Sequence, residues 1–176
     1  MNMAMKDKKF PMTPAGFEKL QQELAQLKTH ERPAIIAAIA DARRHGDLSE
    51  NAEYHAAKEK QKNLERRISD IELKLASAEV IIPSASQENN IVFGATIHLE
   101  DLDTEKKRVF QIVGEEEADI SLGRISVTSP LARGLLGKTV DEEVDIQTPG
   151  GLHVYRILKI SYDLPAEASH LDQKPT

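Results

Sequence analysis

The sequence predicts an α+β chain in which a long antiparallel two-helix coiled-coil hairpin precedes a small β-rich domain. Residues 13–82 carry apolar side chains at the three- and four-residue spacing of a coiled coil. Residues 91–163 carry short β-prone runs that turn signals separate. The stretch 83–90 between them is polar and aperiodic, as in a linker. Residues 1–12 and 164–176 are expected to be a flexible N-terminus and a disordered tail.

Two rows of apolar residues predict how the two helices of the hairpin pair. When one row is read forwards and the other backwards, the residue numbers of every pair have the same sum, as an antiparallel hairpin requires. This register places the turn between Asp47 and Leu48. Ile35, Ile36 and Ile39 lie beside the row and are interpreted as a wider apolar stripe. The pairs are Phe17 with Ala78, Leu20 with Leu75, Leu24 with Ile71, Leu27 with Ile68, Glu31 with Leu64, Ala34 with Gln61 and Ala38 with Ala57.

The ends of the two helices carry local signals. Thr13 followed by Pro14 predicts an N-cap and a first helical position. Gly46 can adopt the left-handed conformation that ends the first helix. Asp47 is then expected to cap the second helix, with Glu50 completing a capping box. The predicted tip of the hairpin is therefore residues 46–50.

The β-rich domain is predicted from five short runs. Ser129 and Pro130, followed by an apolar segment that ends at Gly137, predict one short helix within this domain. The pattern Thr148, Pro149, Gly150, Gly151 predicts a turn between the last two strands. The runs are residues 91–99, 108–113, 124–127, 143–147 and 153–161.

Composition narrows the class of function. The net charge of −6 over 176 residues disfavours tight nonspecific binding to duplex DNA, and most of the excess acid lies in residues 91–163. The absence of cysteine excludes disulfides and thiolate metal sites, and six histidines show no metal-binding spacing. The absence of tryptophan disfavours a stacking platform for single strands. No apolar run approaches the length of a membrane span, so a cytoplasmic protein without a membrane partner is expected.

The turn holds the candidate chemistry. Asp47 and Glu50 offer carboxylate oxygens, which Mg²⁺ prefers, but two carboxylates make an incomplete site whose remaining ligands must come from a partner. The same spacing also forms a capping box, so a purely structural role stays open. The apolar Leu48 at the outermost point is not explained by capping.

Several motifs along the chain are specific enough to compare with known families. The tip segment 46–55 reads Gly-Asp-Leu-Ser-Glu-Asn-Ala-Glu-Tyr-His, with Arg32 and Pro33 upstream. Further motifs follow at 93–96, 112–114, 126–137 and 148–151. Together they resemble the bacterial Gre transcript-cleavage factors, and the resemblance covers residues 12–163. The nearly neutral hairpin is similar to the A-type rather than the more basic B-type members.

The resemblance implies a function and a set of site residues. Such factors bind RNA polymerase at the rim of its secondary channel, insert the hairpin and stimulate the polymerase's own cleavage of the backtracked RNA 3′ end. The chain would then be an accessory factor rather than an enzyme, with no cofactor of its own. Asp47 and Glu50 would hold Mg²⁺ jointly with the polymerase, in agreement with two-metal chemistry. Arg43 and Lys58 match RNA-contacting positions, although the family pattern leads us to expect arginine at position 58.

The same resemblance assigns the remaining residues. The second domain resembles an FK506-binding-protein-like fold without isomerase activity, and it would dock on the polymerase. A DNA contact within the elongation complex is left open. The expected tip support is Gly46, Ser49, Asn51, Glu53 and Tyr54, and the expected docking turn is Ser129, Pro130, Leu131, Ala132 and Arg133.

The rival interpretation is a coiled-coil module without a role in cleavage. It would be an inhibitor that occupies the polymerase channel or a chaperone-like hairpin. The tip keeps the simple Asp-x-x-Glu-Asn form, whereas inhibitory relatives have a more acidic, rearranged tip, so stimulation of cleavage is favoured. Release of short 3′ RNA fragments from a stalled complex would discriminate the two.

Overall fold

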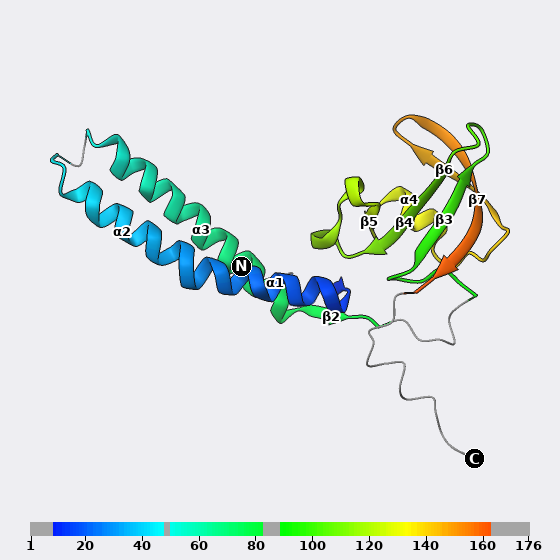
Figure 1. Cartoon of the computed structure of the whole chain (residues 1–176), viewed down its shortest axis with the longest axis horizontal. Helices are drawn as coiled ribbons and strands as arrows, with labels where there is room; N and C mark the ends of the chain where they lie inside the picture. Colours follow the sequence, from blue (N-terminus) through cyan, green and yellow to red (C-terminus); the bar gives the residue numbers. More distant parts are fainter. Residues whose placement is uncertain (1–8, 48–49, 83–88, 163–176) are drawn as a thin grey trace, which may run out of the picture. The chain divides into compact units, whose positions relative to one another are not determined.

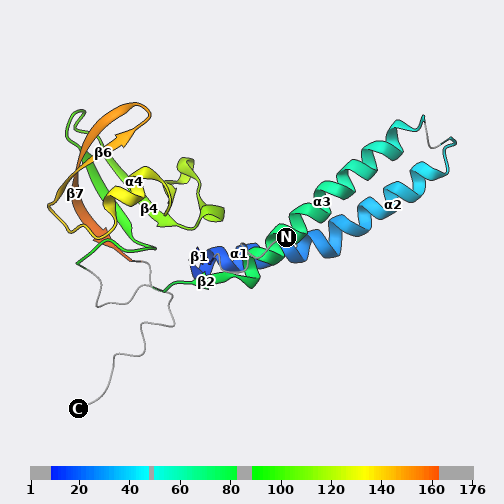
Figure 2. The same ribbon diagram turned by 180° about the vertical axis from the view of Figure 1, so that it is seen from behind.

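The computed structural model describes residues 9–47, 50–82 and 89–162. These residues form two compact units. One is a helical unit built on residues 17–78, and the other is a β-rich unit built on residues 11–16 and 79–162. Figure 1 shows the elements of each unit, and Figure 2 shows them from behind. Within the described ranges, none of the helices has both the length and the apolar character that a bilayer crossing requires.

The helical unit is an antiparallel hairpin. Its first arm consists of α1 (Pro14–Gln26), a π-helical turn η1 (Leu27–Glu31) and α2 (Arg32–Arg43). Its second arm is the single helix α3 (Ala52–Ala76). Both ribbon views show α2 and α3 side by side (Figures 1 and 2).

The half of the hairpin near its base follows the predicted seam. Leu20 and Leu27 of the first arm are buried, as are Ile68 and Ile71 of α3. Two ion pairs bridge the arms beside this seam: Glu23 binds Arg67, with Oε1 to Nε 2.8 Å apart, and Lys28 binds Glu72. The predicted register therefore agrees with the burial of this half.

The half near the turn departs from the predicted seam by one residue. Glu31, Ala34 and Ala38 were expected to face α3, but all three are exposed. Ile35 is half-buried, while Ile39 and Ala42 are buried, as are Ala57 and Leu64 of α3. Each inward position thus lies one residue later in the chain than predicted, and the predicted pairs of Glu31, Ala34 and Ala38 are wrong.

The π turn is the cause of this shift. In η1 the backbone N–H of Arg32 donates to the carbonyl oxygen of Leu27, five residues earlier, so this turn holds one residue more than an α-helical turn. Pro33 follows directly; it lacks an N–H, and its ring in a regular helix would clash with the carbonyl of Thr29. The Thr29 hydroxyl also donates to the carbonyl oxygen of Ala25 at 2.8 Å, an interaction that favours bending. A wide turn at this place accommodates the proline and rotates every later side chain.

Two short strands come directly before α1 and after α3 in the sequence. β1 (Phe10–Met12) pairs with β2 (Ala78–Val80) in a two-stranded sheet. Met12 is buried at 2% exposure. Residues 10–12 were expected in the flexible N-terminus and residues 78–80 in the helix, so the structure differs from both expectations.

The β-rich unit contains a five-stranded sheet in the order β5-β4-β3-β7-β6. β3 pairs antiparallel with both β4 and β7, β6 pairs antiparallel with β7, and β4 pairs parallel with β5. The first strand begins at Thr96 rather than at the predicted residue 91, because Gly94 adopts a φ of 88° in the turn before it. The strands are β3 (Thr96–Asp101), β4 (Lys107–Val113), β5 (Arg124–Ser126), β6 (Glu143–Thr148) and β7 (Gly151–Ser161).

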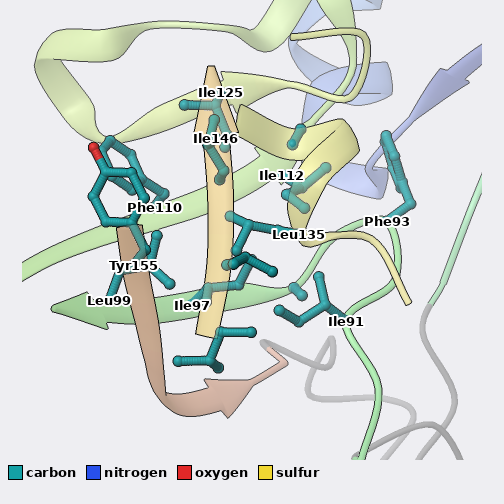
Figure 3. Packing of buried hydrophobic residues seen from close by; sticks show 14 residues of the cluster. Ile91, Phe93, Ile97, Leu99, Phe110, Ile112, Ile125, Leu135, Ile146 and Tyr155 are labelled. Carbon is teal, nitrogen blue, oxygen red and sulfur yellow. The ribbon is translucent and has the colours of Figure 1, made fainter. Parts of the chain in front are cut away.

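One hydrophobic core holds this sheet together (Figure 3). Its strand residues alternate inward, as a sheet with one buried face requires. The short helix α4 (Pro130–Leu135) adds Ala132 and Leu135, both 0% exposed. The central members are Ile91, Ile97, Leu99, Ile112 and Ile157. The predicted fold class, an α+β chain with a long helical hairpin and a small β-rich domain, is confirmed.

Candidate functional site

Asn51, in the turn between α2 and α3, is the N-cap of α3. Its side-chain oxygen accepts a hydrogen bond from the backbone N–H of Tyr54 at 3.0 Å, which is the N-cap interaction of α3. Its Nδ2 donates to the carbonyl oxygen of Ala42 at 2.6 Å, near the end of α2. One side chain therefore joins the two helix ends, and the predicted capping role of Asp47 is wrong.

The two carboxylates lie in the turn itself. Asp47 and Glu50 are both exposed and both precede the first residue of α3, Ala52. Gly46 adopts a φ of 119°, a conformation that side-chain-bearing residues rarely take. The helix itself ends earlier than predicted, because α2 stops at Arg43 and Arg44 is its C-cap. Leu48 and Ser49 lie outside the described residues. Because Asn51 caps α3, capping does not explain the acidic residues at positions 47 and 50.

A basic and aromatic group flanks the turn. The guanidinium carbon of Arg43 lies 5.9 Å from the centre of the Tyr54 ring, within cation–π range. Tyr54 also meets His55 edge to face, with ring centres 5.6 Å apart. Lys58 follows Tyr54 by one helical turn, so the two share a face of α3. Arg43 and Tyr54 are therefore in contact near the turn, and Lys58 lies on the same face of α3 as Tyr54.

The remaining tip residue, Glu53, occupies the first turn of α3 and is exposed. A carboxylate in this position interacts favourably with the positive end of the helix dipole. Lys58 is exposed and donates from Nζ to Oε1 of Gln61 at 3.0 Å. These contacts are local, so they leave both side chains at the surface of the hairpin.

The predicted docking turn is well formed in the β-rich unit. The Ser129 hydroxyl accepts from the backbone N–H of Ala132 at 3.2 Å, and Pro130 occupies the first helical position of α4. Pro130 and Arg133 are exposed, while Ser129 and Leu131 are half-buried. Ala132 is 0% exposed and belongs to the core, so it cannot contact a partner and is removed from the docking set.

Sequence reasoning missed two features of the tip. It assigned the cap to Asp47 although Asn51, an equally good capping residue, stands four positions later. It also treated Arg43 and Tyr54 separately, since their contact depends on the pairing of the helices. Asparagine directly before the run Ala52, Glu53, Tyr54 was the available signal for the cap.

Comparison with known proteins assigns the family. A model described as "Transcription elongation factor, N-terminal" matches residues 10–80, and one described as "Transcription elongation factor, GreA/GreB, C-term" matches residues 86–162. The chain belongs to the GreA/GreB family of transcription elongation factors. The first model spans the hairpin, and the second spans the β-rich unit.

Individual relatives support the A-type assignment within the GreA/GreB family. A "Transcription elongation factor GreA" of Beijerinckia indica is 54% identical over 154 residues, covering 88% of this chain and 98% of the relative. GreA of Caulobacter sp. strain K31 has the same identity and coverage. GreA of Thermodesulfovibrio yellowstonii is 52% identical over 155 residues, again with 88% and 98% covered. The predicted resemblance to the A-type members is confirmed.

Two solved structures are similar at lower identity. The GreA factor homolog 1 (Gfh1) protein of Thermus thermophilus is 25% identical, with a TM-score of 0.40 over 88% of this chain and 99% of that chain. A GreA/GreB factor from Nitrosomonas europaea is 21% identical, with a TM-score of 0.40 over 88% of this chain and 100% of that chain.

Proposed function

We propose that this chain is an accessory factor that binds RNA polymerase, inserts its hairpin into the secondary channel and stimulates the polymerase's own cleavage of backtracked RNA. The observation that carries the proposal is the cap of α3. Asn51 satisfies the backbone N–H of Tyr54, so Asp47 and Glu50 precede the helix without acting as its cap. Both carboxylates are exposed, and since neither is the N-cap of α3, we attribute their place in the turn to a role toward a partner.

Asp47 and Glu50 fit a shared magnesium ion. Both side chains offer the hard oxygen ligands that Mg²⁺ prefers, and both are exposed at the turn. Two carboxylates leave coordination positions for the polymerase and for water. When bound there, the ion would stabilise the attacking oxygen of a water molecule during hydrolysis. The chain contributes the ligands and their placement, and the polymerase contributes the rest of the reaction centre.

Arg43 and Lys58 would hold the RNA. Both are exposed cations at the tip end of the hairpin, and phosphate groups attract such side chains. The ring of Tyr54 lies under the Arg43 guanidinium and restricts where that cation can point. An extruded RNA 3′ end would therefore meet positive charge at the same end of the hairpin as the two carboxylates.

The β-rich unit would dock on the rim of the polymerase channel through the turn before α4. Pro130 and Arg133 are its exposed members. The Ser129 cap and the buried Ala132 hold this turn rigidly on the core. Pro130→Ala combined with Arg133→Ala should therefore weaken polymerase binding while leaving the melting temperature nearly unchanged.

The test is the rate of 3′ RNA fragment release from a backtracked elongation complex at saturating factor. Asp47→Asn and Glu50→Gln remove the charge and retain the shape, so both variants should bind polymerase like the parent and lose most cleavage. Glu59→Gln, an exposed carboxylate of α3 away from the turn, is the matched control and should cleave at the parental rate.

The rival function, an inhibitor without a role in cleavage, predicts a different result. The parent would then slow elongation and release no fragments, and the Asp47 and Glu50 variants would behave like the parent. Parental cleavage rates in both variants would likewise reject the role of the carboxylates.

A further inference from the structure

A second group of metal-ligand side chains lies within the β-rich unit. Asp101 ends β3, Asp103 follows it in the β3–β4 turn, and His153 lies in β7. One ligand atom from each of the three side chains lies within 4.8 Å of the other two. Among the described residues this is the one such group of His, Asp and Glu side chains.

The sheet register brings these residues together. Asp101 pairs with Tyr155 across β3 and β7, two residues from His153, and the N–H of Leu102 donates to the carbonyl oxygen of Val154 at 2.9 Å. Asp101 follows Ile97 and Leu99 on the inward face of β3 and is only 6% exposed. A charged side chain at a core-facing position requires compensation.

His153 has a ligand atom that makes no hydrogen bond. Its Nδ1 is buried, and this atom has no hydrogen-bond partner within the described part of the chain. Buried polar atoms without partners are rare in folded proteins and call for an explanation. The ring stacks on Tyr155, with centres 6.1 Å apart and planes at 27°, which restricts the plane of the imidazole.

The spacing of the first two ligands fits a bridging ion better than a direct hydrogen bond. Nδ1 of His153 lies 3.5 Å from Oδ2 of Asp101. This distance exceeds the usual range for an N–H···O bond, about 2.7–3.2 Å. Two ligands held at about 2.0–2.2 Å from one tetrahedral ion lie roughly 3.3–3.6 Å apart.

Asp101 is also oriented as metal ligands are. Its Oδ1 accepts the backbone N–H groups of Asp103 and Thr104, each at 3.0 Å, which leaves Oδ2 to face His153. Such second contacts commonly hold a ligating carboxylate in place. Burial opposes ionisation of Asp101, but hydrogen bonds from Thr104 and Asp103 outweigh it and, with His153, lower the pKa of the carboxyl.

We propose that Asp101, Asp103 and His153 bind a divalent first-row transition metal of the Zn²⁺ type, with water completing its coordination. One imidazole nitrogen favours such an ion over Mg²⁺ or Ca²⁺, which prefer oxygen alone. Asp103 is exposed, so its side chain can turn toward the other two without disturbing the core. The site would join the β3–β4 turn to β7 and is independent of the proposed role of the hairpin.

The experiment is a titration of the full chain, without a histidine tag, with Zn²⁺ followed by calorimetry and with Co²⁺ followed by visible absorption. One equivalent should bind, and the Co²⁺ bands should have the intensity of a site with four or five ligands. His153→Gln and Asp103→Asn should each weaken binding at least about tenfold. Zn²⁺ should raise the melting temperature of the parent and leave that of either variant unchanged.

His98→Gln is the matched control, because His98 is a half-buried histidine of β3 outside this group. It should bind Zn²⁺ like the parent. Absence of saturable binding to the parent would overturn the proposal, and so would unchanged affinity in Asp103→Asn, whose exposed position keeps the fold intact. Loss of binding in the His98 variant alone would assign the metal elsewhere and also overturn it.

Discussion

The two halves of the hairpin use the same kind of seam but differ in register by one residue. Near the base, Leu20 and Leu27 of the first arm are buried, as regular heptad spacing predicts. Near the turn, Ile39 and Ala42 are buried in place of the predicted row, because the π turn at Leu27–Glu31 adds one residue. One residue corresponds to a rotation of about 100° in a helix of 3.6 residues per turn.

This difference matters for the tip. Ala42, Arg43 and the turn that follows all lie beyond the π turn, so their orientation depends on it. Burial of Ala42 places its carbonyl oxygen where Asn51 can bind it at 2.6 Å. The π turn, although remote from the carboxylates, therefore sets which side chains face α3 and which face outward at the tip.

The largest expected effect comes from changing the register directly. In a Pro33→Ala background, deletion of His30 should convert the π turn to a regular turn and keep Ile39 inward. Deletion of Ala37 in the same background should instead turn Ile39 and Ala42 outward and cost at least about 3 kcal/mol more in free energy of unfolding. Urea unfolding measures both, and equal stability of the two deletions would refute the shifted register.

A smaller effect compares two isoleucines of α2. Ile39 is 8% exposed and Ile36 is 52% exposed. Ile39→Ala should cost about 2–4 kcal/mol through lost burial and a cavity, whereas Ile36→Ala should cost less than about 1 kcal/mol. If thermal or urea unfolding gave the reverse order, the shifted seam would be wrong.

The cap of α3 should give an effect of about 1 kcal/mol. Asn51→Ala removes the acceptor for the Tyr54 N–H and the donor to Ala42, so it should destabilise by about 0.5–2 kcal/mol. Asp47→Ala should cost less than Asn51→Ala, since Asp47 is not the N-cap of α3. The two variants are compared by urea midpoint, and a larger loss in Asp47→Ala would restore the capping-box interpretation.

The smallest expected effect concerns the ion pair beside the π turn. Arg32 donates to Glu65 from Nε at 2.8 Å and from Nη2 at 2.6 Å, and this contact lowers the pKa of Glu65. A lowered folded-state pKa contributes stability above the unfolded value, about 4.3, and that contribution is lost as pH falls through the folded value. Glu65→Gln should therefore reduce the fall in melting temperature between about pH 5 and pH 2. An unchanged fall in melting temperature would show that the pair contributes nothing.

Much of the fold follows from patterns in the sequence. The antiparallel hairpin and its base seam follow from 3-4 spacing, and Leu20 and Ile71, which that spacing places in the seam, are buried. Strand runs and the Ser129 cap follow from short-range chemistry. The π turn could not be predicted in this way, since a heptad pattern containing Pro33 does not reveal how the helix accommodates a missing N–H.

The candidate sites also differ in how far the sequence alone could predict them. Asp47, Glu50 and Arg43 could be proposed because they are close in sequence and resemble a known motif. The cap could not be decided, since Asp47 and Asn51 are both good N-caps and the choice depends on the length of the turn. The group of Asp101, Asp103 and His153 could not be predicted at all, because it depends on the register of β3 with β7.

The most direct test of the account is a single comparison of Asp47→Asn with Asn51→Ala, measuring both the urea midpoint and the rate of 3′ RNA fragment release. We expect opposite outcomes. Asp47→Asn should keep the parental midpoint and lose most cleavage, while Asn51→Ala should lower the midpoint and lose much less cleavage at a temperature where it is folded, because both carboxylates remain. If Asp47→Asn cleaves at the parental rate, or if cleavage in the two variants simply follows their stability, the tip carboxylates are structural and the proposed function is wrong.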